Sequence, residues 1–566
     1  PHPNLPRVSI RLLAGLLLLA LPLFASAQTV IGSSSELVSA AQTGGDYLLA
    51  AGSYRLSETL VISADFRLVG EGMNLSRIIS KAPLIAVEVT GDIDVYFEGV
   101  SFEYQGQEPA DIMNIQDARF YIQSCRFTGG VFAEGEEEGD LFYGAGLWLY
   151  GTAQGVVRDS VAADNEQSGI HLEGKARLEL YNSSIQGNDC GLCLFDETQL
   201  VMHGTNLQGN VLALYAEHDS VVTLAESRFT ESLEGHVYIL GNAQLEARSS
   251  SFETAGDTFA ALSAQEQAQV WLYDNQLANN HMGAVYLYGQ ASAVFEANRF
   301  EQNGHDGFNA FSLSDDATAQ LLANHFNLNG GGAISVFKNA NVEIKGNRIE
   351  NNGNWTAVYV AGNSQVTFTN NHLNANDGVG IAVLGEAVAT VSANQFVGNY
   401  DEGVYLGDKA RASLSLNSLQ DNARGVALYD EAVAYMAVNE FAENLVGVVL
   451  NGQSFAILHE NLFFSENSDG LQLWDASRAV VRENHFMRHT YAVVAASEAA
   501  SWLERNELKE NLHGLLVYEG ARLHLRDNQF RDNDIALYLL DEAQLEPTGN
   551  SFEGNQRDVV RSTESQ

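Results

Sequence analysis

The sequence is poor in cysteine and in basic side chains, and both shortages exclude classes of protein. Its 566 residues hold only three Cys, too few for a disulfide framework, so packing and hydrogen bonds must stabilise the fold. Lys and Arg number 30 against 72 Asp and Glu, and the formal charge of −42 argues against binding to nucleic acid or to anionic lipid. The hydrophobic fraction of 45% is enough for a core, so the chain is not disordered.

The chain begins with the pattern of a secretory signal peptide. Arg7 and Arg11 precede the apolar run 12–24, which ends at Ala25-Ser26-Ala27. A basic flank, a short apolar core and a small-x-small site together predict cleavage after Ala27. A membrane anchor is the alternative, but a span needs about 20 apolar residues, and no later run is long enough. Residues 1–27 are therefore predicted to be a signal peptide, and the mature protein to be secreted, periplasmic or at the cell surface.

A frame of 22–24 residues repeats through the rest of the chain. Each block contains Asn-x-Phe or a close variant, such as Asn394-Gln395-Phe396. Each block also contains an alternating run such as Gly403-Val404-Tyr405-Leu406, which predicts a short strand with Val404 and Leu406 inward and Tyr405 outward. Three short strands cannot bury the apolar face of one block, so the blocks are expected to stack on one another.

The repeated Asn has a structural explanation. When coils stack, Asn side chains at one turn position can hydrogen-bond along the axis and satisfy amides that the turn would otherwise bury unpaired. Asn also tolerates the left-handed backbone conformation of a sharp turn. The sequence therefore predicts a structural Asn ladder without a catalytic role. Its predicted members include Asn347, Asn371, Asn394, Asn417, Asn439 and Asn461.

These features define the expected architecture. The chain is predicted to be all-β, a solenoid of about 21 coils in which like strands pair in parallel. Leucine-rich and ankyrin repeats have similar periods, but they need a helix or a Leu frame that this sequence lacks. Residues 28–76 are expected to form an N-terminal cap with the first coils, including a short helix over 34–42 that covers the open end. The rod is expected over 77–566, with an insertion loop at 129–144.

The opening of the repeat resembles a known superfamily. Segment 45–56, GDYLLAAGSYRL, is followed by Leu60-Val61-Ile62 and then by Leu68-Val69-Gly70-Glu71-Gly72. Together with the repeat, this opening resembles the right-handed parallel β-helices of the pectate-lyase-like superfamily, over nearly all of the mature chain. The resemblance implies a single-stranded right-handed parallel β-helix, in a class of secreted carbohydrate-binding proteins and sugar hydrolases. One scaffold of this kind carries many activities, so the resemblance implies no particular reaction.

The resemblance also implies where an active site would lie, on the outer face of the Gly-Val-x-Leu strand. The motifs of polygalacturonases, pectate lyases, pectin esterases and alginate epimerases do not occur intact, so no catalytic role is carried over. The candidate catalytic residues, predicted at equivalent places just before this strand, are Asp377, Glu402, Arg424 and Asp469. Two acids beside an Arg can titrate at separate pKa values, as acid–base catalysis requires. Solvated turn residues are the alternative, because acid clusters are common at this charge.

Aromatic side chains form a second candidate site on the same outer face. They fall into two neighbouring columns, and the predicted sugar-stacking residues are Tyr288, Phe337, Tyr405, Tyr429, Trp474 and Tyr518. Tyr215 is assigned to the column of Tyr429, whose members follow an inward Leu or Val. Exposed rings suit the apolar faces of sugars, although stacked rings can also simply stabilise neighbouring strands.

Two weaker features concern metals. The insertion carries the acidic residues Glu134, Glu136, Glu137, Glu138 and Asp140. These carboxylates could bind Ca²⁺, but no known calcium loop is present, and a solvated acidic loop is the alternative. Cys190 and Cys193 form a C-x-x-C without a second pair of ligands, which argues against zinc, and alternation places Cys193 outward. No metal site is therefore assigned.

Two functions compete on this evidence. The first is a secreted, non-catalytic and monomeric rod that binds a polysaccharide or surface glycan along one sheet. The second is a polysaccharide lyase, hydrolase or epimerase with an acidic site on the same face. A negative surface repels polyuronates unless Ca²⁺ or a basic patch intervenes, so neutral glycans fit the charge better. Because no catalytic motif is intact, binding is favoured.

Overall fold

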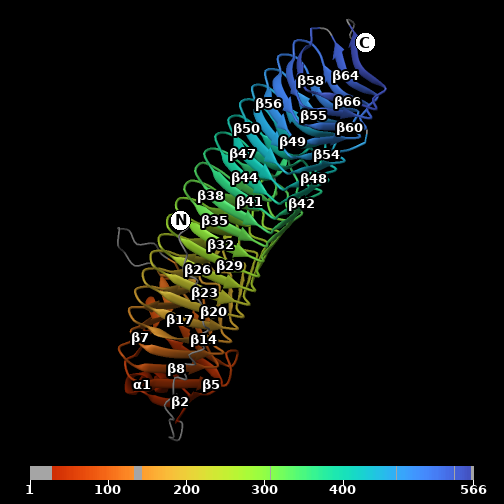
Figure 1. Cartoon of the computed structure of the whole chain (residues 1–566). Coiled ribbons are helices and arrows are strands. Elements are labelled where there is room, and N and C mark those ends of the chain that lie inside the picture. Colours follow the sequence, from red (N-terminus) through yellow and green to blue (C-terminus); the bar gives the residue numbers. More distant parts are fainter. Residues whose placement is uncertain (1–28, 133–142, 306, 467, 541, 563–566) are drawn as a thin grey trace.

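The chain winds into a long, gently curved rod of stacked coils (Figure 1). The computed structural model describes residues 29–132, 143–305, 307–466, 468–540 and 542–562. Within them, three sheets hold 23, 22 and 22 strands, and the strands of one coil pair in parallel with those of the next. The predicted all-β parallel solenoid is confirmed, with about 22 coils instead of 21. The predicted signal peptide lies outside the described residues.

One coil contributes one strand to each sheet. In a central coil, β46 (Glu402–Leu406) lies in sheet C, β47 (Arg411–Ser415) in sheet A and β48 (Ser418–Gln420) in sheet B. Burial along β46 follows the predicted alternation, because Val404 and Leu406 are fully buried while Tyr405 is half-buried. The same alternation fills one continuous apolar core along the rod.

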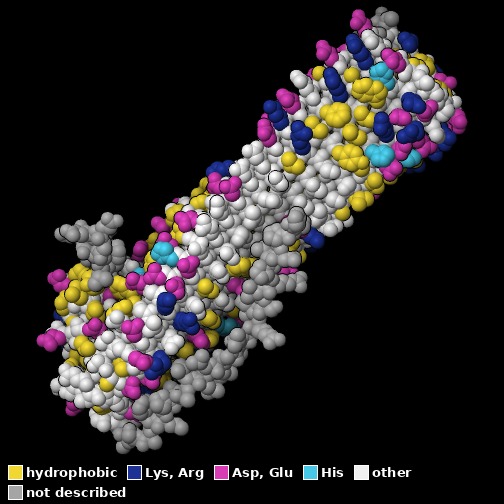
Figure 2. Space-filling view, turned by 60° about the vertical axis from the view of Figure 1, so that its left-hand side comes forward, with side chains coloured by type: hydrophobic (Ala, Val, Ile, Leu, Met, Phe, Trp, Pro, Cys, Tyr) yellow, Lys and Arg dark blue, Asp and Glu magenta, His cyan; other side chains and the backbone are white. Residues whose placement is uncertain are grey.

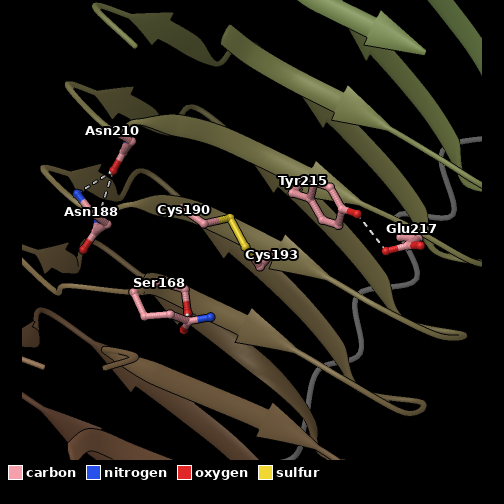
Figure 3. Close-up of a disulfide and its surroundings, with 8 residues drawn as sticks. Ser168, Asn188, Cys190, Cys193, Asn210, Tyr215 and Glu217 are labelled. Carbon is pink, nitrogen blue, oxygen red and sulfur yellow. Dashed lines mark hydrogen bonds between the residues drawn. A yellow bond between two sulfur atoms is a disulfide. The ribbon is translucent and has the colours of Figure 1, made fainter. Parts of the chain in front are cut away.

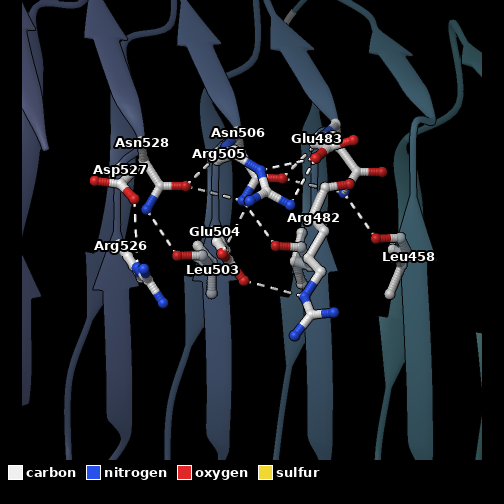
Figure 4. Close-up of polar contacts among 12 residues, drawn as sticks. Leu458, Arg482, Glu483, Leu503, Glu504, Arg505, Asn506, Arg526, Asp527 and Asn528 are labelled. Atoms are coloured by element: carbon white, nitrogen blue, oxygen red, sulfur yellow. Dashed lines mark hydrogen bonds and ion pairs between the residues drawn. The ribbon is translucent and has the colours of Figure 1, made fainter. Parts of the chain in front are cut away.

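The predicted Asn ladder lies at the turn between sheets A and B. Asn394 is buried, and its Nδ2 donates to Asn417 Oδ1 at 3.0 Å and to the Phe368 carbonyl at 2.8 Å. Its Oδ1 accepts from the Asn371 amide at 2.8 Å. Equivalent bonds join the other predicted members, Asn347, Asn371, Asn417, Asn439 and Asn461. Figure 4 shows the ladder near the C-terminal end, where Asn506 donates to Asn528.

A second Asn ladder, absent from the sequence-based prediction, lies five residues further along each coil. Asn399 Nδ2 donates to Asn422 Oδ1 at 3.0 Å, and Asn422 repeats the bond to Asn444. At one rung His489 replaces Asn and still donates its backbone amide to Asn511 Oδ1 at 2.9 Å. The repeated Asn-x-Phe-x-x-Asn frame contains this second Asn, but its burial depends on how the coil turns after sheet B.

A short helix closes the first coil. The helix α1 (Ser34–Thr43) begins after Ser33, whose hydroxyl accepts from the Glu36 amide at 3.3 Å as an N-cap. Leu37 and Ala40 are buried in the same core as the first strands. Figure 1 shows the helix at the N-terminal end of the rod. The predicted capping helix is confirmed and is one residue longer than expected.

The predicted insertion lies between β12 (Arg126–Thr128) and β13 (Leu147–Tyr150). Its acidic residues fall within 133–142, outside the described residues. Both ends of the insertion are attached to the rod, since the Val131 amide donates to the Ala110 carbonyl at 3.1 Å and the Gly144 amide donates to Asp111 at 3.0 Å. In the described part of the chain, no helix has the length and apolar character needed to cross a membrane.

Candidate functional site

On the outer face of sheet C, side chains three residues apart along one strand meet in at least two strands. In β19 (Cys190–Leu194), Cys190 and Cys193 form a disulfide across this face (Figure 3). Gln472 Nε2 donates to Asp469 Oδ2 at 2.7 Å over the same spacing. In a regular strand, residues three apart point to opposite sides of the sheet. For both side chains to lie on one face, each of these strands departs from regular geometry at the Gly after its first residue, Gly191 or Gly470. The disulfide itself is not predicted from the sequence.

Five aromatic rings form a continuous strip on this face, here called the central ring cluster: Phe337, Trp355, Tyr359, Tyr405 and Tyr429. Ring centroids lie 5.4 Å apart for Phe337–Tyr359 and 6.0 Å apart for Trp355–Tyr359. The corresponding distances are 5.9 Å for Trp355–Tyr405 and 5.3 Å for Tyr405–Tyr429. The strip crosses five coils, which is about 20 Å along the axis.

Trp355 completes the strip where a strand offers no ring of its own. The register places Ala382 between Tyr359 and Tyr405, and its small side chain leaves the space that Trp355 covers. Trp355 is 45% exposed. Trp355 is not among the predicted site residues, because it precedes β40 (Thr356–Val360) in a turn and belongs to neither column. The sequence signal that could have identified Trp355 is an aromatic residue directly before a predicted strand.

An ion pair borders the central ring cluster. Glu402 and Arg424 lie opposite one another in the register, as predicted, and Arg424 Nη1 donates to Glu402 Oε1. Glu402 is buried while the Arg424 side chain is 40% exposed, so the guanidinium is the accessible member. Burial alone would lower the pKa of Arg424, but the hydrogen bond to Glu402 prevails and raises it. Burial, followed by the charge of Asp430, raises the pKa of Tyr405, so its phenol stays neutral.

Asp377 does not occupy the place predicted for it. The register pairs Ile381 with Val404, and continuing it by two residues puts Val379 opposite Glu402. Asp377 is exposed in the preceding turn, so the prediction that Asp377 and Glu402 are equivalent is wrong. The prediction aligned Gly378 with Gly403, the glycine that follows Glu402. This coil has a second glycine, Gly380, and the register places Gly380 opposite Gly403.

Asp469 begins a separate group nearer the C-terminus. Asp469, Tyr491 and His513 lie opposite one another in three consecutive coils. The rings of Tyr491 and His513 stack with centroids 4.8 Å apart. Burial raises the pKa of Asp469 and lowers that of His513. The predicted rings Trp474 and Tyr518 adjoin this group and meet edge to face, with centroids 6.2 Å apart.

The remaining predicted ring, Tyr288, belongs to a third group nearer the N-terminus. Its hydroxyl oxygen is 2.8 Å from that of Tyr238. Tyr215 pairs in register with Tyr238, a member of the other column, so its assignment to the column of Tyr429 is wrong. The strand continues for one more residue to Ala216, which is buried. The prediction counted only Leu and Val as inward residues, so it ended the strand too early and placed Tyr215 after it. Among the described residues, three ring groups therefore share the outer face of sheet C.

Three potential metal ligands converge at one place in the described residues. One ligand atom each from His459, Glu460 and Glu483 lie within 4.8 Å of one another. Arg505 Nη2 is 2.7 Å from Glu483, so a cationic side chain already pairs with one member. The group lies beside the Asn ladder, between sheets A and B, and establishes no cofactor. The possible Ca²⁺ of the sequence analysis stays a prediction.

The parallel sheets, the Asn ladders and the coil length define the chain as a right-handed parallel β-helix protein. A family model described as "Right handed beta helix region" matches residues 74–211, 122–258, 212–356, 356–500 and 424–565. The chain belongs to this family. The matched segments cover nearly the whole predicted rod and confirm the resemblance in fold. A search of curated proteins found no match.

Solved structures with a similar fold are distant in sequence. Geobacillus virus E2 ORF18 is 13% identical, with a TM-score of 0.34 over 54% of this chain and 60% of that chain. DFA-IIIase from Arthrobacter chlorophenolicus A6 is 10% identical, with a TM-score of 0.32 over 50% of this chain and 87% of that one. The PL6 family alginate lyase AlyGC is 10% identical, with a TM-score of 0.34 over 95% and 98% of the two chains. The likeness concerns the fold alone.

Proposed function

We propose that the protein is a secreted rod that binds a glycan chain through the central ring cluster, without catalysis. The observation that carries this proposal is the continuity of five rings over five coils, none of them buried. Aromatic faces pack against the apolar faces of sugars, and a strip along the axis suits a chain of sugar rings. Cross-strand stacking alone would not need Trp355, which comes from a turn and adds exposed ring surface.

The polar groups beside the rings favour a neutral glycan. Arg424 is accessible, but Glu402 balances its charge, so the site offers guanidinium and phenol donors without a net positive charge. Sugar hydroxyl oxygens can accept from these donors. A polyuronate would find no net positive charge at this site, in a chain whose formal charge is −42. The proposal leaves out catalysis because Glu402 is buried and already paired, and Asp377 does not share its place in the register.

The test is to remove two rings of the central ring cluster and measure glycan binding by the full chain. Neutral and acidic glycans are screened on an array, and retained glycans are then titrated by calorimetry. Trp355→Ala combined with Tyr405→Ala should weaken neutral glycan binding at least tenfold, because each stacked ring contributes about 1 kcal/mol. The matched control removes Tyr96 and Tyr121, a stacked pair on sheet A, and should leave the affinity unchanged. The proposal fails if the double variant binds like the wild type, or if no neutral glycan is retained.

A second candidate function is polysaccharide processing at Asp469, Tyr491 and His513. The observation in its favour is that burial moves two pKa values in opposite directions, raising that of Asp469 and lowering that of His513. A carboxyl group that protonates more easily and a neutral imidazole are the pair that acid–base chemistry needs. Each retained glycan is therefore incubated with the protein and its products are analysed by mass spectrometry. Product release that Asp469→Asn abolishes, with binding retained, would make the protein an enzyme.

A further inference from the structure

The outer face of sheet A carries a concentration of cations near the C-terminal end of the rod. The strands concerned are the neighbours β56 (Arg478–Arg482), β59 (Ala500–Glu504) and β62 (Arg522–Arg526). Their outward positions hold four Arg and a single Glu: Arg478, Val480, Arg482, Ala500, Trp502, Glu504, Arg522, His524 and Arg526. In a chain with 30 bases against 72 acids, this is a local reversal of charge. Figure 2 shows basic, His and hydrophobic side chains gathered at this end among acidic ones, beyond a largely uncharged middle stretch.

A column of rings and apolar side chains runs between these arginines. The register places Tyr435, Ile457, Val480, Trp502 and His524 opposite one another in five successive coils. The Trp502 side chain is 47% exposed and stacks on the His524 imidazole, with centroids 5.4 Å apart and planes 7° apart. The column is therefore a flat, partly aromatic track about 20 Å long, parallel to the rod axis.

The arginines on one side of the track differ from those on the other side in their partners. Arg478 and Arg522 are exposed, and neither forms an ion pair within the part of the chain that the structure describes. Ala500 lies between them in the register, so they are two coils, or about 10 Å, apart. Exposed guanidinium groups of this kind are suited to bidentate pairing with the carboxylate or sulfate groups of a ligand.

The arginines on the other side have acidic neighbours. Arg482 Nε is 3.2 Å from Glu504 Oε2, and Arg526 Nε is 3.3 Å from Asp527 Oδ2 (Figure 4). Glu504 is also shared with Arg505, whose Nη1 lies 3.2 Å from Glu504 Oε1. The arginine side chains of these pairs are 52% and 69% exposed, so a ligand anion can reach them and compete with the carboxylates.

Acidic turn residues bound this face on both edges. They are Asp475, Glu498 and Glu519 before the three strands, and Glu483 and Asp527 after two of them. In the next coil Glu546 pairs with His524 Nδ1 at 2.8 Å, which ends the basic region toward the C-terminus. A membrane surface or a nucleic acid duplex laid on this face would also meet these acids. A single extended chain on the track would meet mainly the arginines.

We propose that this arginine face, formed by Arg478, Arg482, Trp502, Arg522, His524 and Arg526, binds a linear anionic glycan. The apolar faces of the sugars lie on Trp502 and His524, and their carboxylate or sulfate groups pair with the arginines on either side. The site is independent of the central ring cluster, because it lies on sheet A and not on sheet C, and because it carries a net positive charge that the cluster lacks. The rod would then hold a neutral glycan and an anionic glycan on separate faces.

The experiment titrates the full chain with polygalacturonate, dextran sulfate and neutral dextran at low and at high NaCl concentration. We expect at least one anionic polymer to bind, and its affinity to fall as salt screens the arginines. Arg478→Gln with Arg522→Gln should lower this affinity at least tenfold, and Arg478→Lys with Arg522→Lys should lower it less, because Lys keeps the charge but cannot pair bidentately. The charge-matched control is Arg228→Gln with Arg299→Gln, two exposed arginines of sheet B. The carboxylated and sulfated polymers distinguish the two kinds of anionic group.

Further variants separate this proposal from its competitors. Trp502→Ala should weaken binding of the anionic polymer, and Trp355→Ala with Tyr405→Ala should leave it unchanged even if the central ring cluster binds nothing. Far-ultraviolet circular dichroism and the melting temperature verify that each variant is folded. The proposal is overturned if neither anionic polymer binds, or if the Arg478 and Arg522 variant matches the sheet B control. It is also overturned if duplex DNA or anionic lipid vesicles bind as tightly and are lost in the same variant.

Discussion

Removing one rung of the Asn ladder should destabilise the rod far more than removing an exposed Asn. The Asn394 side chain takes part in four hydrogen bonds, with Nδ2 donating to the Phe368 carbonyl at 2.8 Å and to Asn417 Oδ1 at 3.0 Å. Its Oδ1 accepts from the amide and from Nδ2 of Asn371, at 2.8 and 3.1 Å. Asn394→Ala removes all four and leaves the Asn371 amide buried without this acceptor. At about 1 kcal/mol for each bond, the free energy of unfolding should fall by about 4 kcal/mol.

The assay must be local as well as global, because a solenoid of this length can unfold in parts. Urea denaturation gives the change in the free energy of unfolding, and hydrogen exchange at the Asn371 amide reports the broken rung directly. The control is Asn341→Ala, an exposed position on sheet A, which should change stability by less than about 0.5 kcal/mol. The ladder reasoning is refuted if Asn394→Ala is as stable as this control and the Asn371 amide stays protected.

Three further predictions concern stability. Burial lowers the pKa of His489 to about 4, so between about pH 4 and its ordinary pKa of about 6.5 the unfolded chain binds a proton that the folded chain does not. Stability should therefore fall as the pH drops through this window. His489→Asn, which restores the usual ladder residue, should make that part of the melting-temperature profile less steep, with the buried His171 and His236 contributing the rest. Cys190→Ser with Cys193→Ser should lower the free energy of unfolding by no more than about 2 kcal/mol in urea, because a disulfide between residues three apart closes a very small loop. Gly447→Ala should destabilise the rod by about 1–3 kcal/mol. The new Cβ would lie 2.6 Å from the Gly470 carbonyl oxygen and 2.8 Å from the Phe463 ring, and an unchanged urea midpoint would contradict the prediction.

The features predictable from the sequence are those that repeat within one coil. Val404 and Leu406 face inward, and Tyr405 outward, because strand alternation depends only on neighbouring residues. The ladder at Asn394 was predictable because its spacing recurs in the adjacent coils. The opposition of Glu402 and Arg424 could also be predicted, since both coils have the same length between their strands. These features determine a parallel β-helix and the sheet face on which rings and charges gather.

Which residues of adjacent coils lie side by side was decided only by the tertiary structure. Val379, and not Asp377, lies opposite Glu402, because the glycine that matches Gly403 is Gly380 and not Gly378. The alternation within one strand carries no information about its register with the next strand. Trp355 joins the ring strip from a turn, because a neighbouring coil has only a small side chain at the facing position. Arg478 and Arg522 become neighbours of one track only when three coils are stacked in register. The physical reason is that contacts between coils depend on how many residues each turn contains and on the space each side chain leaves, and both are properties of several coils together.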